Sequence, residues 1–296
     1  MLDRESTFAD KELIAMLKEQ FIPVAIDQWY TRAQKDPEGE FYQAIAGQGP
    51  RKDMKQTTQG WYVCDAAGKL YGYRNNRRDN TIKQIMAQAL TEFDSDSKFE
   101  ALSSDVFDPA YQRSLPAGAV VIRVNTKVLS GYKETEDTFQ KIFQRSIARD
   151  NLWILADEIE QLKEGVVTAS LATRIARFHL IDNTRGEPTM WSKTDIKSMD
   201  MKLDGDGRFT GDVEIKSSKT GFRTKLLGTV TFDGDQLQQF DIVARGWYHG
   251  EGHYTRNAPN GEFSVAVAFR MTDGSDIADP VAPQGSKGWL EGYLKP

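Results

Sequence analysis

The strongest constraint on the fold is a series of strand-like segments in the second half of the chain. After Gly165, short runs of β-branched and aromatic residues alternate with turn sequences such as LDGDGR, KTG, DGDQ and APNG. Within 222–232, one face is largely apolar and the other carries Arg223 and Lys225, the period of two typical of a half-buried strand. Turns this short join antiparallel neighbours. We therefore expect strands over 166–181, 196–203, 208–217, 222–232, 237–248 and 262–271.

These strands need a second layer that covers their apolar face. The sequence AVVIRVNTKVL, residues 119–129, predicts another strand after the chain break SLPAG. Residues 134–163 show apolar side chains at helical spacing in two groups and predict one or two helices. The expected fold class is α+β, with a helix-supported antiparallel sheet or partly closed barrel after a separate N-terminal domain. The Gly- and Pro-rich tail from Asp273 onward predicts a surface arm whose end docks through Trp289, Leu290 and Tyr293.

The N-terminal residues predict a smaller unit with the element order αβαββα. Ser6 or Thr7 can cap the first helix, and Pro23 would end it. Asp36 followed by Pro37 is typical of a second helix start. We expect helices over 6–20, 36–47 and 79–93, a short buried strand over 24–26, and a hairpin in GWYVCDAAGKLYGYR.

Residues 4–93 resemble the thioredoxin fold. The match consists of core positions rather than reactive groups, namely Arg4, Glu5, Ser6, Phe8, Leu13, Phe21, Ile22, Val24 and Asp27, then Gln59 to Val63, Gly68 and Leu70. In that family a cysteine motif would lie just before Leu2, and a cis-proline just before the hairpin. This sequence has Thr57 and Thr58 at the second position. The resemblance therefore implies a thioredoxin-like domain that lacks the CxxC motif and the cis-proline.

The single cysteine, Cys64, limits the redox chemistry of the chain. One thiol forms neither an intrachain disulfide nor a CxxC pair, so dithiol chemistry within this chain is excluded. Because Cys64 lies in the strand-like run WYVCD, we expect it to pack as a small apolar side chain.

Charge and hydropathy limit the partners. The net charge of -5 argues against nucleic-acid binding, which requires a surplus of Lys and Arg. No run approaches the roughly 18 apolar residues of a membrane span, so we expect neither a nucleic-acid partner nor a span. The N-terminal MLDREST has no signal-peptide features. The sequence leaves the compartment open: it is cytoplasmic as written, and periplasmic or exported if an upstream leader has been removed.

A change of composition after Asp94 marks the domain boundary. The sequence DSDSKFEALSSDV is rich in Ser and Asp and is typical of a linker. We therefore expect a thioredoxin-like domain without redox cysteines over 1–94 and a linker with a connecting strand over 95–130. A helical hairpin plus antiparallel β domain would follow over 131–296.

The loop HLIDNTRGEPTMW is the first candidate ligand-binding region. It carries His179, Asp182, Arg185 and Glu187 between a predicted strand and an aromatic residue. Arg185 could clamp a carboxylate, and Asp182 could orient His179 or accept a proton. The alternative is an ordinary Asn-Thr-Arg-Gly turn in which these side chains have no ligand.

The run QFDIVARGWYHGEG contains the other candidates. Alternation places Arg245 and Trp247 on one strand face, where they can form a wall for an anion or a planar ligand. His249, Glu251 and His253 follow at spacings of two and would form a metal ligand set if they project together. The flanking glycines favour the alternative of surface histidines near a strand end.

The sequence favours a non-catalytic two-domain protein that acts as a binding or structural module. Its partner would be an unidentified protein or small-molecule ligand, and no cofactor is expected. Two alternatives remain open at this point. The first is a thiol-disulfide oxidoreductase whose cysteine motif lies upstream, and the second is a metal-dependent protein that uses the β-domain histidines.

Overall fold

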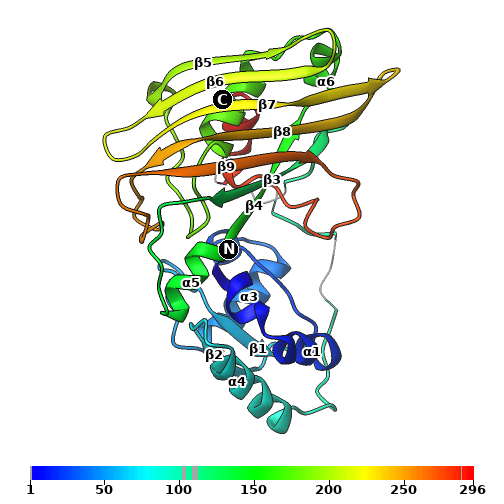
Figure 1. The fold of residues 1–296 in the computed structure, drawn as a ribbon. Helices are drawn as coiled ribbons and strands as arrows, with labels where there is room; N and C mark the ends of the chain where they lie inside the picture. Colours follow the sequence, from blue (N-terminus) through cyan, green and yellow to red (C-terminus); the bar gives the residue numbers. More distant parts are fainter. Residues whose placement is uncertain (1, 102–104, 109–112, 288) are drawn as a thin grey trace. The chain divides into compact units, whose positions relative to one another are not determined.

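The protein has a mixed α+β structure with one seven-stranded antiparallel sheet and one two-stranded sheet (Figure 1). The structure is a computed structural model and describes residues 2–101, 105–108, 113–287 and 289–296. Two compact units divide the chain, residues 3–112 and residues 113–296 together with Leu2. Part of the expected linker, at 102–104 and 109–112, lies outside the described residues.

The seven-stranded sheet is the framework of residues 113–296. Its spatial order is β4-β3-β9-β8-β7-β6-β5, and all neighbours are antiparallel. The five strands from β5 onward agree with the strand pattern of the sequence to within about two residues. The strands are β3 (Val120–Val128), β4 (Ile147–Ile154), β5 (Ile196–Leu203), β6 (Arg208–Lys216), β7 (Gly221–Asp233), β8 (Gln236–His249) and β9 (Glu262–Met271).

Local turn chemistry explains why these strands start and stop where they do. In LDGDGR, the Asp204 carboxylate accepts the backbone N–H groups of Asp206 and Arg208 at 3.1 and 2.9 Å. Gly207 completes this turn with φ +78°, a conformation that residues with a Cβ rarely adopt. The turn therefore sets β6 antiparallel to β5.

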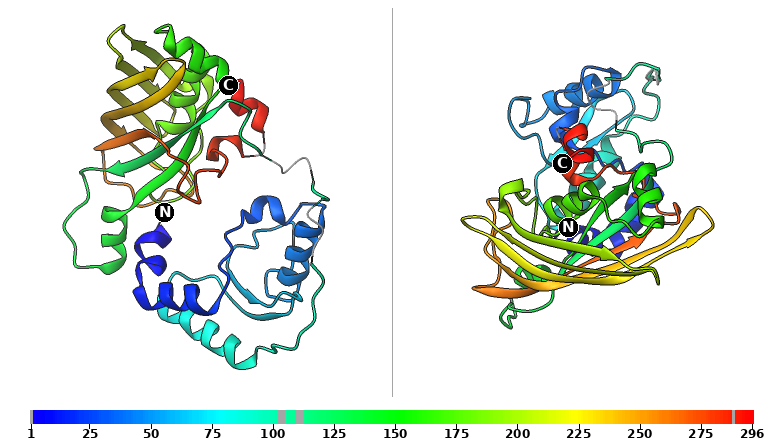
Figure 2. Two further views of the ribbon diagram at one scale, coloured as in Figure 1. Left: turned by 90° about the vertical axis from the view of Figure 1, so that its right-hand side faces the viewer. Right: turned by 90° about the horizontal axis from the view of Figure 1, so that it is seen from above.

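Helices cover one face of the sheet, which we call the inner face (Figure 2). This face carries Phe222, Leu226 and Val267, which belong to one core with Leu171 and Ile175. The opposite, outer face carries the charged residues of β7 and β8. The helical segments of this unit are α5 (Thr138–Arg145), α6 (Ala156–Lys163), α7 (Ala169–Arg174), the π turn η3 (Ile175–His179), η4 (Lys193–Asp195), η5 (Gln284–Ser286) and α8 (Leu290–Leu294).

Two expectations for this unit were wrong. Residues 166–181, expected as a strand, form α7 and η3 instead. The Thr168 hydroxyl accepts the Leu171 N–H at 3.1 Å and starts the helix, whose apolar side chains then pack on the inner face. Residues 147–154, expected within the helical segment 134–163, form β4. This edge strand is buried on both sides over its second half, so its sequence lacks the alternation of a half-buried strand.

The C-terminal arm, residues 273–296, docks as the sequence predicts. Tyr293 is fully buried, beside Trp153 and Phe178, and Leu290 packs against this cluster. Trp289, in contrast, stays largely exposed. The arm is also held at its start, because Arg149 pairs with both Asp276 and Asp279 at 2.6 and 2.8 Å.

Residues 3–112 contain three longer helices and a hairpin. Leu13, Ile82 and Met86 form the core of this unit with Val63 of the hairpin. Asp10, and not Ser6 or Thr7, caps the first helix by accepting the Leu13 N–H at 2.7 Å. The elements are η1 (Leu2–Glu5), η2 (Thr7–Ala9), α1 (Lys11–Gln20), α2 (Gln28–Thr31), α3 (Pro37–Gly47), β1 (Trp61–Cys64), β2 (Leu70–Arg74) and α4 (Asp79–Glu92).

The expected strand over 24–26 does not form. Residues 21–27 are irregular, and the side chains of Ile22 and Val24 are 91% and 75% exposed. Among the described residues, β1 pairs only with β2, so this apolar run has no strand beside it. A strand needs a hydrogen-bonded neighbour, and apolar sequence alone cannot supply one. Cys64 also differs from expectation, because it lies exposed at the end of β1.

Candidate functional site

Two polar assemblies of residues 113–296 contain three of the residues singled out by the sequence, His179, Arg245 and Trp247. The first is buried between the helices and β4, and we call it the buried polar cluster. It consists of Asp150, Glu158, Arg174, His179 and Tyr293. The second is an open depression on the outer face of the sheet, which we call the outer hollow.

His179 lies at the centre of the buried polar cluster. Its Nδ1 is 3.2 Å from Oδ2 of Asp150, and its Nε2 is 2.9 Å from the hydroxyl of Tyr293. The wide turn η3, closed by the Leu180 N–H to Ile175 carbonyl bond of 2.9 Å, positions the ring. The structure thus gives to Asp150 the orienting position that the sequence suggested for Asp182.

A buried ion pair adjoins this histidine. Arg174 is fully buried, and its guanidinium pairs with the Glu158 carboxylate and donates to the Leu294 carbonyl at 3.0 Å. Burial of both charges is expensive unless each is hydrogen-bonded, and here they are. Burial also raises the pKa of Tyr293, so its hydroxyl stays protonated and available to donate.

Asp182 and Arg185 form a second, separate buried pair. Oδ2 of Asp182 lies 2.6 Å from Nη1 of Arg185. Arg185 also donates to the Thr255 carbonyl at 3.1 Å and to the Tyr132 hydroxyl at 3.2 Å. Burial by itself would lower the pKa of Arg185, but the charge of Asp182 and the bond with Tyr132 outweigh it and raise that pKa. Arg185 therefore binds a carboxylate, as the sequence suggested, but this carboxylate is the side chain of Asp182 and not a ligand.

Glu187 completes the predicted loop set and lies closer to solvent. Its carboxylate binds the Lys287 ammonium at 2.9 Å, which ties the 182–187 loop to the C-terminal arm. The structure thus brings His179, Asp182, Arg185 and Glu187 into one region, yet each has its own internal partner.

The three residues suggested as metal ligands contact other groups. Glu251 accepts the Ala258 N–H at 3.0 Å, and the His253 ring packs edge-on against Tyr254 with centroids 4.5 Å apart. His249 lies at the end of β8, beside Gly221 of the neighbouring strand. Over the described ranges, no three His, Cys, Asp or Glu side chains are placed to hold a metal ion.

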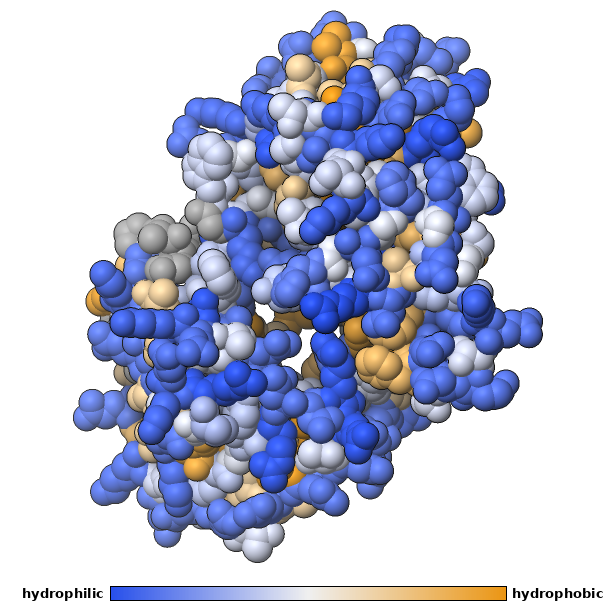
Figure 3. Space-filling model, turned by 90° about the vertical axis from the view of Figure 1, so that its left-hand side faces the viewer, coloured by the Kyte–Doolittle hydropathy of each residue, from blue (hydrophilic) through white to orange (hydrophobic). Residues whose placement is uncertain are grey.

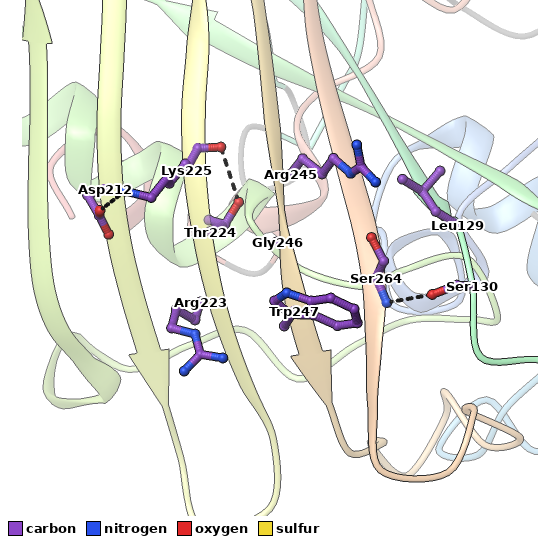
Figure 4. Close-up of a pocket in the computed structure, with 10 residues that line it drawn as sticks. All are labelled: Leu129, Ser130, Asp212, Arg223, Thr224, Lys225, Arg245, Gly246, Trp247 and Ser264. Atoms are coloured by element: carbon purple, nitrogen blue, oxygen red, sulfur yellow. Dashed lines mark hydrogen bonds and ion pairs between the residues drawn. The ribbon is translucent and has the colours of Figure 1, made fainter.

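The outer hollow contains Arg245 and Trp247 and has a volume of about 570 Å³ (Figure 4). Both side chains project from β8 on the outer face. Ser264 of β9 forms its floor, and Leu129, just after β3, lies at its far side (Figure 4). The close packing of β7 and β8 beneath depends on Gly246, because a Cβ there would lie 2.0 Å from the Arg223 carbonyl oxygen.

The register of β7 and β8 concentrates positive charge in the hollow. Lys225 stands directly opposite Arg245, and Arg223 directly opposite Trp247. Lys225 turns away toward Asp212, with Nζ 2.8 Å from the carboxylate (Figure 4). Arg223 lies 3.8 Å from Glu262. Within the part of the chain that the structure describes, the Arg245 guanidinium has no hydrogen-bond or ion-pair partner.

Apolar side chains extend the same face. Leu227 and Val243 are opposite each other, one step further along β7 and β8, and both are about half exposed. The view in Figure 3 is largely hydrophilic with small hydrophobic groups. The outer hollow therefore combines positive charge with accessible apolar surface, a pairing suited to ligands that carry both.

Sequence reasoning missed several residues of both assemblies. Asp150 and Glu158 of the buried polar cluster come from segments interpreted as helix, and no local pattern connects them with His179. Arg223 and Lys225 had been placed on a polar strand face, and this alternation was the available signal for the hollow.

Comparison with models of known protein families, with curated proteins and with solved structures finds no match. The geometry of the sites is therefore the basis for any functional conclusion. As for membranes, no helix over the described ranges has both the length and the apolar character to cross a bilayer.

Proposed function

We propose that the protein is a non-catalytic binding protein that holds an anionic ligand in the outer hollow. The observation that carries this proposal is the position of Lys225 directly opposite Arg245. Like charges at directly opposed strand positions destabilise a sheet, and Asp212 compensates only Lys225. A bound anion at Arg245 would remove this repulsion.

The buried polar cluster supports a non-catalytic function. A catalytic group must reach the substrate, whereas the side chains of His179 and Arg174 are both 0% exposed. Every member of the cluster has a partner within the protein. We therefore assign the cluster to the attachment of the C-terminal arm.

The N-terminal unit would serve as a docking or structural element with a thioredoxin-like arrangement. In support, the helices α1 and α3, the hairpin β1–β2 and the helix α4 follow one another in the order that the resemblance implies, whereas its strand over 24–26 does not form. They share a core that includes Leu13, Val63 and Ile82. Cys64 is the single cysteine of residues 1–296 and cannot form a dithiol pair within them, which is compatible with a scaffold role of this unit.

The experiment is an anion screen by isothermal titration calorimetry on the full chain. The panel contains phosphate, citrate, cyclohexanecarboxylate and 2-naphthoate, tested against the native protein and Arg245→Glu. We expect at least one anion to bind the native protein and its affinity to fall at least 10-fold in the variant. Arg208→Glu is the matched control, because Arg208 is an exposed arginine on the outer face of β6, outside the hollow. Failure of all four anions to bind, or equal loss in both variants, would overturn the proposal.

A disulfide-reduction assay tests whether Cys64 itself takes part in thiol-disulfide exchange. With insulin as the substrate, the native chain should show no more turnover than Cys64→Ser. Turnover that requires Cys64 would contradict a purely binding function.

A further inference from the structure

We infer that the ligand of the outer hollow is an aromatic acid, a planar ring that bears a carboxylate, sulfonate or phosphate group. This inference rests on the proposed function, which requires an anionic ligand, and adds that the ligand also carries an aromatic ring. It follows from three features of the hollow, which are one cation without a partner among the described residues, an exposed indole and a floor of small side chains.

Arg245 is the cation left for the ligand. Its guanidinium extends from β8 across β9 toward Leu129, over the open part of the hollow (Figure 4). The neighbouring Lys225 is engaged by Asp212 on the other side, and Arg223 lies near Glu262. One planar guanidinium binds one carboxylate or phosphate group through two parallel hydrogen bonds. A polyanion would instead need a row of free cations, so the hollow favours a ligand with one anionic group.

Trp247 supplies a surface for the ring. Its side chain is 50% exposed on the same strand face as Arg245, two residues further along β8. Positions two apart on a strand are separated by roughly 6.8 Å. A single small molecule can therefore contact the guanidinium and the indole at once. Stacking on an aromatic face contributes beyond simple burial of apolar area.

The floor of the hollow is flat because β9 carries small residues there. Ser264 and Ala266 lie opposite Trp247 and Arg245 respectively. The far side is fixed, since the Leu129 N–H donates to the Ser264 carbonyl at 2.8 Å and the Ser264 N–H donates to the Ser130 hydroxyl at 3.2 Å. Leu129, about half exposed, thus faces Trp247 across a serine-and-alanine floor. A planar ring fits this space, and a volume of about 570 Å³ lies within the range of small-molecule sites.

The test compares ligands that have the ring, the charge or both. Calorimetry on the full chain uses 2-naphthoate, cyclohexanecarboxylate, 2-naphthalenemethanol and a decaglutamate peptide. We expect 2-naphthoate to bind at least 10-fold more tightly than each of the other three. Trp247→Ala should lower the affinity for 2-naphthoate at least 10-fold and change the affinity for cyclohexanecarboxylate by no more than about twofold. Arg245→Gln should lower the affinity for both acids. Trp29→Ala is the matched control, because Trp29 is also 50% exposed but lies outside the hollow.

Two of the outcomes separate this inference from the proposed function, and a third tests both. Equal binding of cyclohexanecarboxylate and 2-naphthoate, both sensitive to Arg245, would overturn the aromatic acid and leave the anion site. Tight binding of decaglutamate with none of 2-naphthoate would likewise overturn it, in favour of an acidic polypeptide. Binding of 2-naphthalenemethanol as tight as that of 2-naphthoate would remove the anion from the site and overturn both. Circular dichroism of each variant verifies that a lost signal reflects the site rather than unfolding.

Discussion

The hydroxyl of Tyr293 lies 2.9 Å from Nε2 of His179, and both side chains are completely buried although 114 residues separate them. The same hydroxyl accepts the Trp153 N–H at 3.4 Å. One phenol therefore joins the C-terminal arm to the edge strand β4 and to the turn η3. This contact makes the arm part of the folded unit and gives the first prediction.

Tyr293→Phe should weaken the attachment of the C-terminal arm, although the phenylalanine ring still fills the space of the tyrosine ring. The variant keeps the ring but leaves a nitrogen of His179 unpaired, which costs about 1–3 kcal/mol. We expect a lower urea midpoint and faster trypsin cleavage after Lys287. Tyr254→Phe, at an exposed tyrosine, should leave both measurements unchanged. Cleavage as slow as in the native chain would contradict the attachment role of the phenol.

Removal of only one charge of the Arg174–Glu158 pair should lower the free energy of unfolding strongly. Glu158→Gln leaves a fully buried guanidinium without its counter-charge, a change that costs about 3–5 kcal/mol. The double variant Arg174→Met/Glu158→Leu removes both charges and should recover a large part of this loss. Urea unfolding of the single and double variants measures the difference. Asp200→Asn, in the exposed Lys202 pair, should cost under about 1 kcal/mol.

The attachment of the arm should weaken in acid. The Ala278 N–H and then Arg149 hold the pKa of Asp276 below its ordinary value of 3.8. Because the folded pKa lies below the unfolded one, this carboxylate contributes stability above the unfolded pKa, and the contribution is lost as the pH falls through the folded pKa. The Ala278 amide signal in NMR should titrate with a midpoint below 3.8, and Asp276→Asn should abolish that titration. A midpoint at or above 3.8 would refute the assignment.

Cys64 should react slowly with alkylating agents near neutral pH in spite of its exposure. Partial desolvation, followed by the nearby Asp65, raises the pKa of its thiol. Thiolate is the reactive form, so iodoacetamide labelling at pH 7.5 should be slower than for an unstructured cysteine peptide and should accelerate as the pH rises above 9. Mass spectrometry of timed samples measures this rate. Asp65→Asn should speed the reaction, and an unchanged rate would exclude a contribution from that carboxylate.

Features fixed by neighbouring residues were predictable from the sequence. The strands from β5 to β9 were found because alternation and turn residues are both local signals. The segment at 24–26 shows the limit, since its apolar sequence is that of a strand but the partner required for pairing is missing from the described residues. The helix that begins at Thr168 was missed because Val166 and Val167 resemble the start of a strand.

In the outer hollow, too, the sequence predicts the strand face on which a residue lies but not the residue that stands opposite it. Alternation correctly placed Arg245 and Trp247 on one face, but the residues opposite them depend on an irregularity. Counting back from the turn, where Asp233 pairs with Gln236, would place Lys225 opposite Ala244. A bulge between Thr231 and Phe232 shifts the pairing by one residue and brings Lys225 opposite Arg245. No local pattern in the sequence predicts this bulge.

The alternation along β7 and β8 has an evolutionary consequence. Arg223 and Lys225 project to one side of the sheet, whereas the adjacent Phe222 and Thr224 project into the core. Substitutions on the solvent side can therefore accumulate and change the charge and shape of that face, while selection for folding acts on the alternate positions. In such a scaffold, the surface can diverge between lineages long before the architecture does.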